Sequence, residues 1–284
     1  MPISDASSGQ PRDLRLDRPH SARMYDYYLG GKTNYDSDRK GAEEALKAWP
    51  AARSAARANR SFMHRAVQVL AHSGFSQFLD IGTGIPTSPN LHEVAQQINP
   101  KARVVYADND PIVLAHARAL LNSTAQGRTA YVEGDITEPD SILGAADLVR
   151  TLDLTQPVAL SINAVMHFVP DARDPYGIAS HLLSVLPAGS ALLLSHVTTD
   201  IDPRGVGHLV QVYTEKGVPT QARSRDEVIA FFAGLELLDP GVVLAHEWRP
   251  DITVPSPAHA LGTTPQRTPT DAEVSLWAGV ALKP

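Results

Sequence analysis

The chain has 284 residues, a formal net charge of −6 and 43% hydrophobic residues. This length accommodates one large α/β domain with an appendage, or two small domains. The acidic balance argues against a broad basic face for nucleic acid, and the absence of cysteine excludes disulfides and thiolate metal sites. No stretch approaches the roughly 20 apolar residues of a membrane span. We therefore expect a cytoplasmic protein without nucleic-acid or membrane partners, and no oligomeric state follows from the sequence.

Composition divides the chain into three zones. Residues 1–17 are polar and are expected to be a disordered lead. Residues 18–75 contain the alanine-rich helical runs Gly41–Trp49 and Ala51–Ser73 and are expected to form an N-terminal helical cap or lid. Residues 76–284 are expected to form the ligand-binding domain.

Short apolar runs alternate with helical stretches through the middle of the chain. Strands are predicted at Phe78–Ile81, Val104–Ala107, Thr129–Val132, Ala159–Ile162 and Ala191–Ser195, and the helices between them at Leu91–Ile98, Pro111–Leu121 and Tyr176–Leu186. Strands that alternate with helices indicate right-handed crossovers and a mostly parallel sheet with helices on both faces. The predicted fold class is therefore α/β.

The last third of the chain is less regular. A loop rich in Gly and Pro is predicted after residue 200, followed by a helix at Asp226–Phe232. Two final strands are predicted at Val242–Trp248 and Val274–Leu282, with a surface loop at Arg249–Thr270 between them because that segment is full of Pro and Thr.

The sharpest local signal is the loop Asp80–Gly84 after the first predicted strand. Glycines there let the backbone turn tightly and approach a ligand closely, although a purely structural turn is the alternative. Asp108 ends the second predicted strand, where a carboxylate can accept hydrogen bonds from both hydroxyls of a ribose. The alternative role for Asp108 is to cap the next helix, but Asp110 directly before Pro111 is better placed for that. Together these signals indicate an adenosine-type ligand.

The chemistry of the loop favours S-adenosylmethionine (SAM) over NAD. A dinucleotide loop reads G-x-G-x-x-G and needs an open helix N-terminus for pyrophosphate, but here the third glycine position is Thr87, preceded by Pro86. The carboxylate of Asp80 would repel a pyrophosphate. It would suit a ligand with an ammonium group, such as the amino-acid tail of SAM.

Two later segments add polar groups at strand ends. Asp135–Ile136 follows the third predicted strand, where a polar side chain could bond the adenine amino group. Ser161–Ala164 ends the fourth and precedes Met166–Phe168, in the region where open α/β sheets place reacting groups. The structural alternatives are a turn for Asp135 and a satisfied loop amide for Asn163.

Several motifs together carry a resemblance to a known family. They are the tyrosine-rich opening Arg18–Tyr35, the run Asn59–Phe62, the core motifs Phe78–Thr87 and Val105–Pro111, and a late turn at Gly234–Gly241. On these motifs the chain resembles the class I SAM-dependent methyltransferases, and more narrowly the S-adenosyl methyltransferase family first catalogued as a domain of unknown function. The resemblance covers nearly the whole chain beyond residue 17. It implies a Rossmann-like seven-stranded sheet whose last strand is antiparallel, and an N-terminal helical cap.

The resemblance also implies where the parts of SAM would lie. Asp80, Gly82 and Gly84 would line the methionine side, Asp108 would hold the ribose, Asn109 would flank the adenine, and Asp135 with Ile136 would complete the adenine pocket. Thr87 departs from the general methyltransferase loop but follows this family's Pro-Thr pattern. Five further candidates complete the cofactor site. Thr83, Arg60 and Tyr28 lie in these motifs, and Asn163 and Ala164 lie at the end of the fourth predicted strand.

The tyrosine-rich opening could form a lid over the ligand, because Gly30–Gly31 could act as a hinge. Aromatic faces stabilise a sulfonium by cation–π attraction, worth on the order of 0.5–2 kcal/mol, although Tyr25 and Tyr28 at i,i+3 could simply pack a helix. Lys32 and Arg60 are candidate anchors for the SAM carboxylate, with solvated surface cations as the alternative. The residues expected on the lid and acceptor side are Tyr25, Lys32, Asn34, Tyr35, Met166 and Phe168.

Methyl transfer from a sulfonium is a displacement that depends mainly on holding the reacting atoms about 3 Å apart. A base helps only if the acceptor must lose a proton, and His167 and His196 are the candidates, each with a structural role as the alternative. No metal is expected, because no H-E-x-x-H or similar spacing occurs. We therefore predict a methyltransferase that uses SAM, releases S-adenosylhomocysteine (SAH) and acts on an oxygen or nitrogen of a small molecule. The alternatives are an NAD-dependent oxidoreductase and a SAM-binding module without turnover.

Overall fold

The computed structural model describes residues 14–120, 122–253 and 267–284. Most of the predicted disordered lead and of the predicted Arg249–Thr270 loop lies outside the described residues. Within the described part, no helix is both long enough and apolar enough to cross a membrane.

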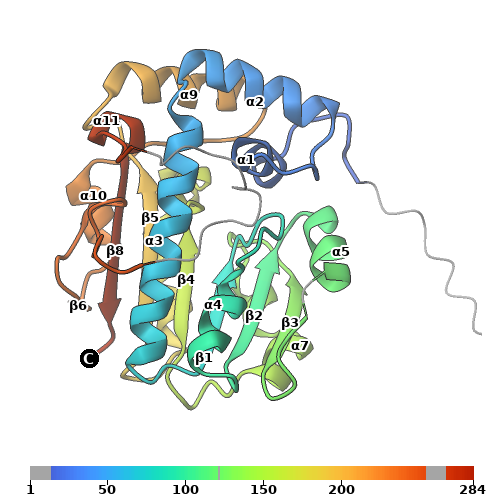
Figure 1. Ribbon diagram of the computed structural model, residues 1–284, viewed down its shortest axis with the longest axis vertical. Helices are drawn as coiled ribbons and strands as arrows, with labels where there is room; N and C mark the ends of the chain where they lie inside the picture. Colours follow the sequence, from blue (N-terminus) through green and yellow to red (C-terminus); the bar gives the residue numbers. More distant parts are fainter. Residues whose placement is uncertain (1–13, 121, 254–266) are drawn as a thin grey trace, which may run out of the picture.

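Among the described residues, a mixed sheet of eight strands forms the centre of the molecule (Figure 1). Its strands are β1 Gln77–Ile81, β2 Arg103–Asp108, β3 Arg128–Glu133, β4 Ala159–Asn163, β5 Ala191–Val197, β6 Glu236–Leu237, β7 Val243–Leu244 and β8 Leu276–Leu282. Their order is β3-β2-β1-β4-β5-β8-β6, and the two-residue strand β7 pairs with β8 beside this path. Strands β1 to β5 are parallel, whereas β8 runs antiparallel to β5. The predicted Rossmann-like sheet with an antiparallel last strand is confirmed.

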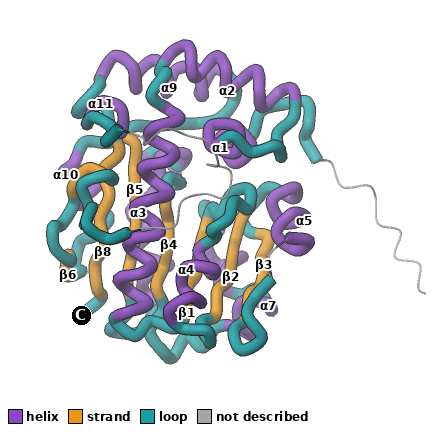
Figure 2. Tube along the Cα trace, viewed as in Figure 1, coloured by secondary structure: helices purple, strands orange, loops and turns teal. Residues whose placement is uncertain are grey.

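Helices cover both faces of the sheet (Figure 2). They are α1 Ser21–Leu29, α2 Asp36–Ala48, α3 Ala52–His72, α4 Leu91–Ile98, α5 Pro111–Leu120, α6 Pro139–Leu143, α7 Ala146–Thr151, α8 Pro175–Ser184, α9 Pro203–Glu215, α10 Arg225–Ala230 and α11 Asp271–Val274, with 3₁₀ turns η1 Met166–Phe168 and η2 Asp171–Arg173. Successive residues of a strand point to opposite faces of the sheet and pack into different hydrophobic clusters. Phe78 packs with α3 and α4, whereas its neighbour Leu79 packs on the side of α7 and α8. This double burial explains why β5 is apolar almost throughout and buried along its whole length.

The N-terminal helices stand over the carboxyl ends of the parallel strands (Figure 1). Helix α3 runs from this layer down the face of the sheet, and α9 packs against α2 in the same layer. The prediction of a Gly- and Pro-rich loop after residue 200 is therefore wrong for α9. Asp202 accepts the N–H of Gly205 at 2.9 Å and Pro203 opens the helix, so the start is well capped. Val206, Leu209 and Tyr213 then bury one face, which outweighs the weak helix propensity of the glycines.

The predicted strand Val242–Trp248 is also shorter in the structure, where only the two residues of β7 pair. The buried guanidinium of Arg65 on α3 donates to the carbonyl oxygens of Ala245 at 2.6 Å and Trp248 at 2.7 Å. These carbonyls therefore bond to a side chain instead of a neighbouring strand. The predicted last strand begins at Leu276 and not at Val274, because Val274 ends α11 and Ser275 has a left-handed backbone.

Candidate functional site

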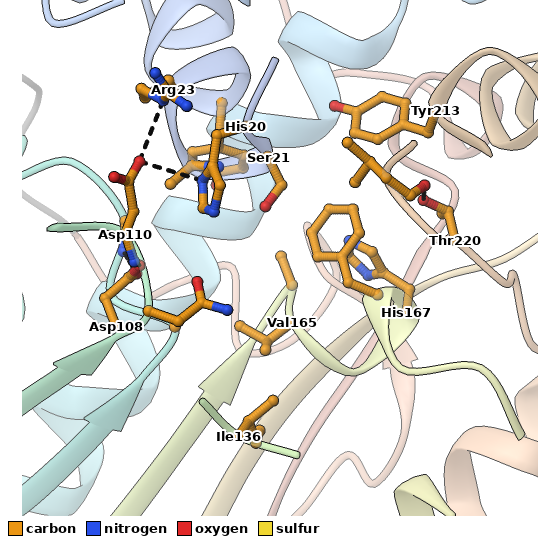
Figure 3. A pocket seen from close by; sticks show the side chains of 18 of the residues that line it. His20, Ser21, Arg23, Asp108, Asp110, Ile136, Val165, His167, Tyr213 and Thr220 are labelled. Atoms are coloured by element: carbon orange, nitrogen blue, oxygen red, sulfur yellow. Dashed lines mark hydrogen bonds and ion pairs between the residues drawn. The ribbon is translucent and has the colours of Figure 1, made fainter. Parts of the chain in front are cut away.

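A cavity of about 950 Å³ lies between the carboxyl ends of the parallel strands and the helices above them. Small-molecule sites span about 300–1,000 Å³, so this volume has room for a cofactor and a second molecule. Figure 3 shows Asp108 and Asp110 at one end of the cavity and His167 and Tyr213 at the other, with His20 above. The loops after β1, β2, β3 and β4 form its floor, and α1, α3 and α9 form its roof.

The glycine loop after β1 depends on two residues with left-handed backbone. Gly82 has a φ of 70° and Gly84 a φ of 69°, a region that side chains disfavour. A Cβ atom on Gly82 would lie 2.2 Å from a methyl carbon of Val165, so this position also needs glycine for space. The loop is held by the N–H of Gly82, which donates to the carbonyl of Ala107 at 2.8 Å. The turn therefore joins the ends of β1, β2 and β4.

The carboxylate of Asp108 at the end of β2 accepts hydrogen bonds from two backbone N–H groups near this turn. One carboxylate oxygen accepts the N–H of Gly84 at 2.8 Å and the other accepts the N–H of Asp110 at 2.9 Å. Burial raises the pKa of Asp108. The two backbone hydrogen bonds and the nearby His20 each lower this pKa. Each oxygen keeps a further lone pair, so the group can still accept hydrogen bonds from a ligand. Asp110 caps α5 by accepting the N–H of Ile112 at 3.0 Å, as predicted for this residue.

Asp80 at the end of β1 closes a chain of polar side chains. The amide of Asn163 donates to the hydroxyl of Ser161 at 2.9 Å, and that hydroxyl donates to Asp80 at 2.6 Å. Burial raises the pKa of Asp80 to about 6, while Ser161 and Arg60 lower it and Asp108 raises it further. The side-chain oxygen of Asn163 is buried and has no hydrogen-bond partner in the described part of the chain. This corner of the cavity therefore presents oxygen acceptors.

The polar residues after β2 and β3 form a second group. Asp135 accepts hydrogen bonds from the backbone and hydroxyl of Thr137 at 2.9 and 2.8 Å, and from the amide of Asn109 at 3.0 Å. Burial opposes ionisation of Asp135, but these bonds outweigh it and lower its pKa. Ile136 lies beside them in the cavity wall. The structure thus brings together the residues that the sequence assigned to adenine.

The residues predicted on the cap divide into two groups. Tyr25, Tyr28 and Arg60 line the cavity. The hydroxyl of Tyr25 donates to the carbonyl of Ala56 at 2.9 Å and accepts the amide of Asn59 at 3.0 Å. One amino group of Arg60 donates to the carbonyls of Thr87 and Pro89, and its Nε atom is buried with no partner among the described residues.

Five predicted site residues lie outside the cavity wall, namely Lys32, Asn34, Tyr35, Met166 and His196. Asn34 donates to Asp26 at 2.8 Å, and the same carboxylate accepts the N–H of Thr33. The side chain of Asn34 is therefore bonded within the turn that follows α1. Lys32 at its tip is exposed to solvent, Tyr35 precedes α2, and Met166 is buried in the core below the site.

The two candidate bases differ in their surroundings. His196 is fully buried, and its Nδ1 atom donates to the carbonyl of Val197 at 2.8 Å while its Nε2 atom accepts from Arg223 at 2.8 Å. Burial lowers its pKa to about 3. With both ring nitrogens engaged and no access to the cavity, His196 has a structural role, contrary to the expectation of a base. His167 lines the cavity, and its Nδ1 atom has no partner in the described part of the chain.

Sequence reasoning missed several residues of the cavity wall. His20 and Arg23 lie in the tyrosine-rich opening, yet no local pattern gave them a role, and both reach Asp110 (Figure 3). Tyr213 belongs to α9, in a segment that the sequence predicts to be a loop. The start Asp202–Pro203 and the spacing of its apolar residues were the signals that could have found it.

Comparisons with known proteins agree with this geometry. Residues 7–284 match the family model described as S-adenosyl methyltransferase. A DUF574-family protein from Streptomyces avermitilis MA-4680 is 47% identical, with a TM-score of 0.87 over 96% of this chain and 100% of that chain. A candidate methyltransferase from Thermobifida fusca YX is 35% identical, with a TM-score of 0.84 over 95% of this chain and 97% of that chain. Among curated proteins, none matches the sequence. The chain belongs to the S-adenosyl methyltransferase family, whose cofactor is SAM.

Proposed function

We propose that this chain transfers the methyl group of SAM to an oxygen or nitrogen of a small molecule, with both reactants in the cavity under α1 and α9. The observation that carries the proposal is the pair Asp80 and Asp108. These carboxylates end two neighbouring parallel strands and line one cavity on either side of the glycine loop. Open α/β sheets bind nucleotide ligands at such strand ends.

The residues present fit SAM better than a dinucleotide. Asp80 and the unpartnered oxygen of Asn163 offer acceptors to an ammonium group, whereas they would repel a pyrophosphate. Helix α4 begins only at Leu91, and a reciprocal capping box of Asn90 and Glu93 already occupies its first N–H groups. No open helix N-terminus therefore follows the glycine loop to receive phosphates.

Each part of the wall then has a task. Asp108 accepts hydrogen bonds from the ribose, and Asn109, Asp135 and Ile136 hold the adenine. When bound, SAM supplies a methyl group that leaves sulfur without the bonding electrons, so that the acceptor atom forms the new bond and sheds its proton. The helices of the roof orient the acceptor and exclude water.

His167 is the proposed partner of the acceptor atom. Burial lowers its pKa well below 6.5, and the nearby His196 and Arg223 lower it further. The imidazole is therefore neutral at pH 7, and its free Nδ1 atom can accept a hydrogen bond from an O–H or N–H group. This contact would orient the acceptor and give its proton a path away from the reacting atom.

Calorimetric titration with SAM, SAH and NAD⁺ tests the proposal. We expect SAM and SAH to bind and NAD⁺ not to bind. Asp108→Ala should weaken SAM binding at least tenfold, because a buried acceptor of ribose hydroxyls is lost. Asp147→Ala on the exposed face of α7 is the matched control and should bind SAM like the native chain.

Two results would count against the proposal. Tight NAD⁺ binding without SAM binding would overturn it, and an unchanged SAM affinity in a folded Asp108→Ala variant would remove the ribose assignment. Turnover with a panel of small-molecule acceptors then separates an enzyme from a module that only binds SAM.

A further inference from the structure

The end of the cavity away from Asp108 is lined by four ring side chains from three elements. We call Tyr28, His167, Phe168 and Tyr213 the aromatic wall. The ring of Phe168 is stacked near-parallel on Tyr213, with centroids 5.9 Å apart, and lies 4.3 Å from the ring of His167. The hydroxyls of Tyr28 and Tyr213 are 2.9 Å apart. The wall therefore joins η1 to α1 and α9, and Figure 3 shows two of its members, His167 and Tyr213, at the same end of the cavity.

The aromatic wall carries no charge at neutral pH. Burial keeps His167 neutral by lowering its pKa, and it raises the pKa of both Tyr28 and Tyr213. The acidic residues Asp80, Asp108, Asp110 and Asp135 lie at the strand ends instead. Two charged residues at the end of α9 also line the cavity, but Glu215 is exposed and accepts the amide of Gln211, and Lys216 pairs with Glu44. A charged molecule placed against the wall would lose its hydration without gaining an opposite charge, which costs several kcal/mol.

The wall nevertheless offers two hydrogen-bonding groups. The two tyrosine hydroxyls carry two hydrogens, and the bond between them uses one, so one hydrogen can still be donated to a ligand. The Nδ1 atom of His167 is buried and has no partner in the described ranges, so it can accept one. Buried groups of this kind gain from a ligand that completes their hydrogen bonds.

We propose that the aromatic wall binds an uncharged aromatic compound with a hydroxyl group. Its ring would stack with Phe168, its hydroxyl would donate to His167, and a second oxygen, where present, would accept from the tyrosine pair. Offset ring stacking adds to the area that the ring buries, which favours a flat aromatic molecule over an aliphatic one. The inference rests on the proposed function, because this hydroxyl would be the methyl acceptor there.

Calorimetry in the presence of saturating SAH tests the charge and the shape of the ligand separately. The probes are 1-naphthol, the anion 1-naphthoate, the cation 1-naphthylmethylammonium and the non-aromatic decahydro-1-naphthol. We expect 1-naphthol to bind and both ions to bind at least tenfold more weakly. The decahydro compound should bind about threefold to tenfold more weakly, the loss expected for ring stacking.

Substitutions in the aromatic wall test whether the probe binds there. Phe168→Leu should weaken 1-naphthol binding about threefold to tenfold while SAH affinity stays within twofold. Tyr213→Phe should weaken the binding of a dihydroxynaphthalene, which carries the second oxygen, about threefold to tenfold and should change 1-naphthol binding much less. Tyr176→Phe is the matched control, because Tyr176 stacks on Phe231 on another part of the molecule, outside the cavity wall. If Tyr213→Phe fails to fold, Tyr28→Phe tests the same hydroxyl pair.

The outcomes distinguish this inference from the proposed function. A chain that binds SAH but binds 1-naphthol no more tightly than 1-naphthoate overturns the assignment of an uncharged ligand. Equal binding of 1-naphthol by Phe168→Leu and the native chain overturns the stacking role. A chain that binds no SAH overturns the proposed function itself.

Discussion

Arg23 on α1 and Asp110 before α5 form a buried ion pair between the N-terminal helices and the ligand-binding end of the sheet (Figure 3). The Nε atom of Arg23 lies 3.2 Å from Asp110 and 3.5 Å from Asp38 on α2, and all three side chains are at most 2% exposed. The N–H of Asp110 donates to Asp108. The ion pair is thus one hydrogen bond away from the carboxylate proposed to hold the ribose.

Arg23→Met should therefore be strongly destabilising. It leaves Asp38 and Asp110 buried without their shared cation, and breaking a buried pair in this way costs about 3–5 kcal/mol. Urea denaturation measures the free energy of unfolding. Arg150→Met is the matched control, because it breaks the exposed pair with Asp147 and should cost less than about 1 kcal/mol. Equal losses of unfolding free energy in the two variants would contradict a stabilising role for the buried ion pair.

Gly82 and Gly84 are expected to respond differently to alanine. Both have left-handed backbone, which costs about 1–2 kcal/mol in alanine. A methyl on Gly84 would meet no atom of the described residues within 4 Å, whereas one on Gly82 would overlap Val165. Gly82→Ala should thus lose a further 1–3 kcal/mol or so of stability by overpacking, measured by urea denaturation. Adding Val165→Ala should recover part of this loss, and no recovery would show that the overlap is not the cause.

The strand ends could be predicted from the sequence because their signals are local. An apolar run, a glycine turn and an acid after the next run are close together along the chain, and parallel strands bring their carboxyl ends to one edge. Asp80, Asp108 and Asp135 accordingly line one cavity. Helix α9 was missed because its glycines and proline resemble a loop, and its helical state depends on packing against α2.

Contacts between distant residues could not be predicted in this way. The hydroxyls of Tyr28 and Tyr213 meet across 185 positions of the chain, and no local pattern marks such a pair. His167 follows the fourth predicted strand and His196 follows the fifth, so the two look equivalent in the sequence, although His196 lies within β5 in the structure. They differ because Arg223, from a loop that is distant in the sequence, donates a hydrogen bond to the Nε2 atom of His196. A base can be told from a structural histidine only when the partners of both nitrogens are known.

SAM affinity should depend on pH through Asp80. Its pKa of about 6 means that the carboxylate is ionised at pH 7 and protonated as the pH falls below 6, and only the ionised form attracts an ammonium group. Affinity measured by calorimetry should therefore fall between pH 7 and pH 5, by at most about tenfold per pH unit.

The matched variant for this pH dependence is Asp80→Asn. It still accepts the hydroxyl of Ser161 through its amide oxygen, but it should bind SAM more weakly and with a flatter pH profile. Arg60, Asp108 and His20 stay in place in this variant. An unchanged profile would therefore show that a group other than Asp80 titrates.

His64 on α3 should make the fold less stable in acid. Its Nε2 atom contacts the carbonyl of Pro89 at 2.9 Å, and burial, with Arg60 nearby, lowers its pKa to about 4. The unfolded chain binds a proton at this residue below about pH 6.5, whereas the native chain does not until about pH 4. Between these values the proton favours unfolding, so stability falls as the pH falls, by about 1.4 kcal/mol per pH unit from this group alone.

His64→Gln isolates that contribution, because glutamine can still donate to the carbonyl of Pro89 but does not titrate. Urea denaturation at several pH values gives the slope of stability against pH for the native chain and the variant. We expect the slope between pH 6 and pH 4.5 to be smaller in the variant by about 1.4 kcal/mol per unit. The difference at pH 8, where the imidazole is neutral in both states, measures the loss of packing alone. Parallel curves over the whole range would mean that His64 is protonated in the native chain as readily as in the unfolded one.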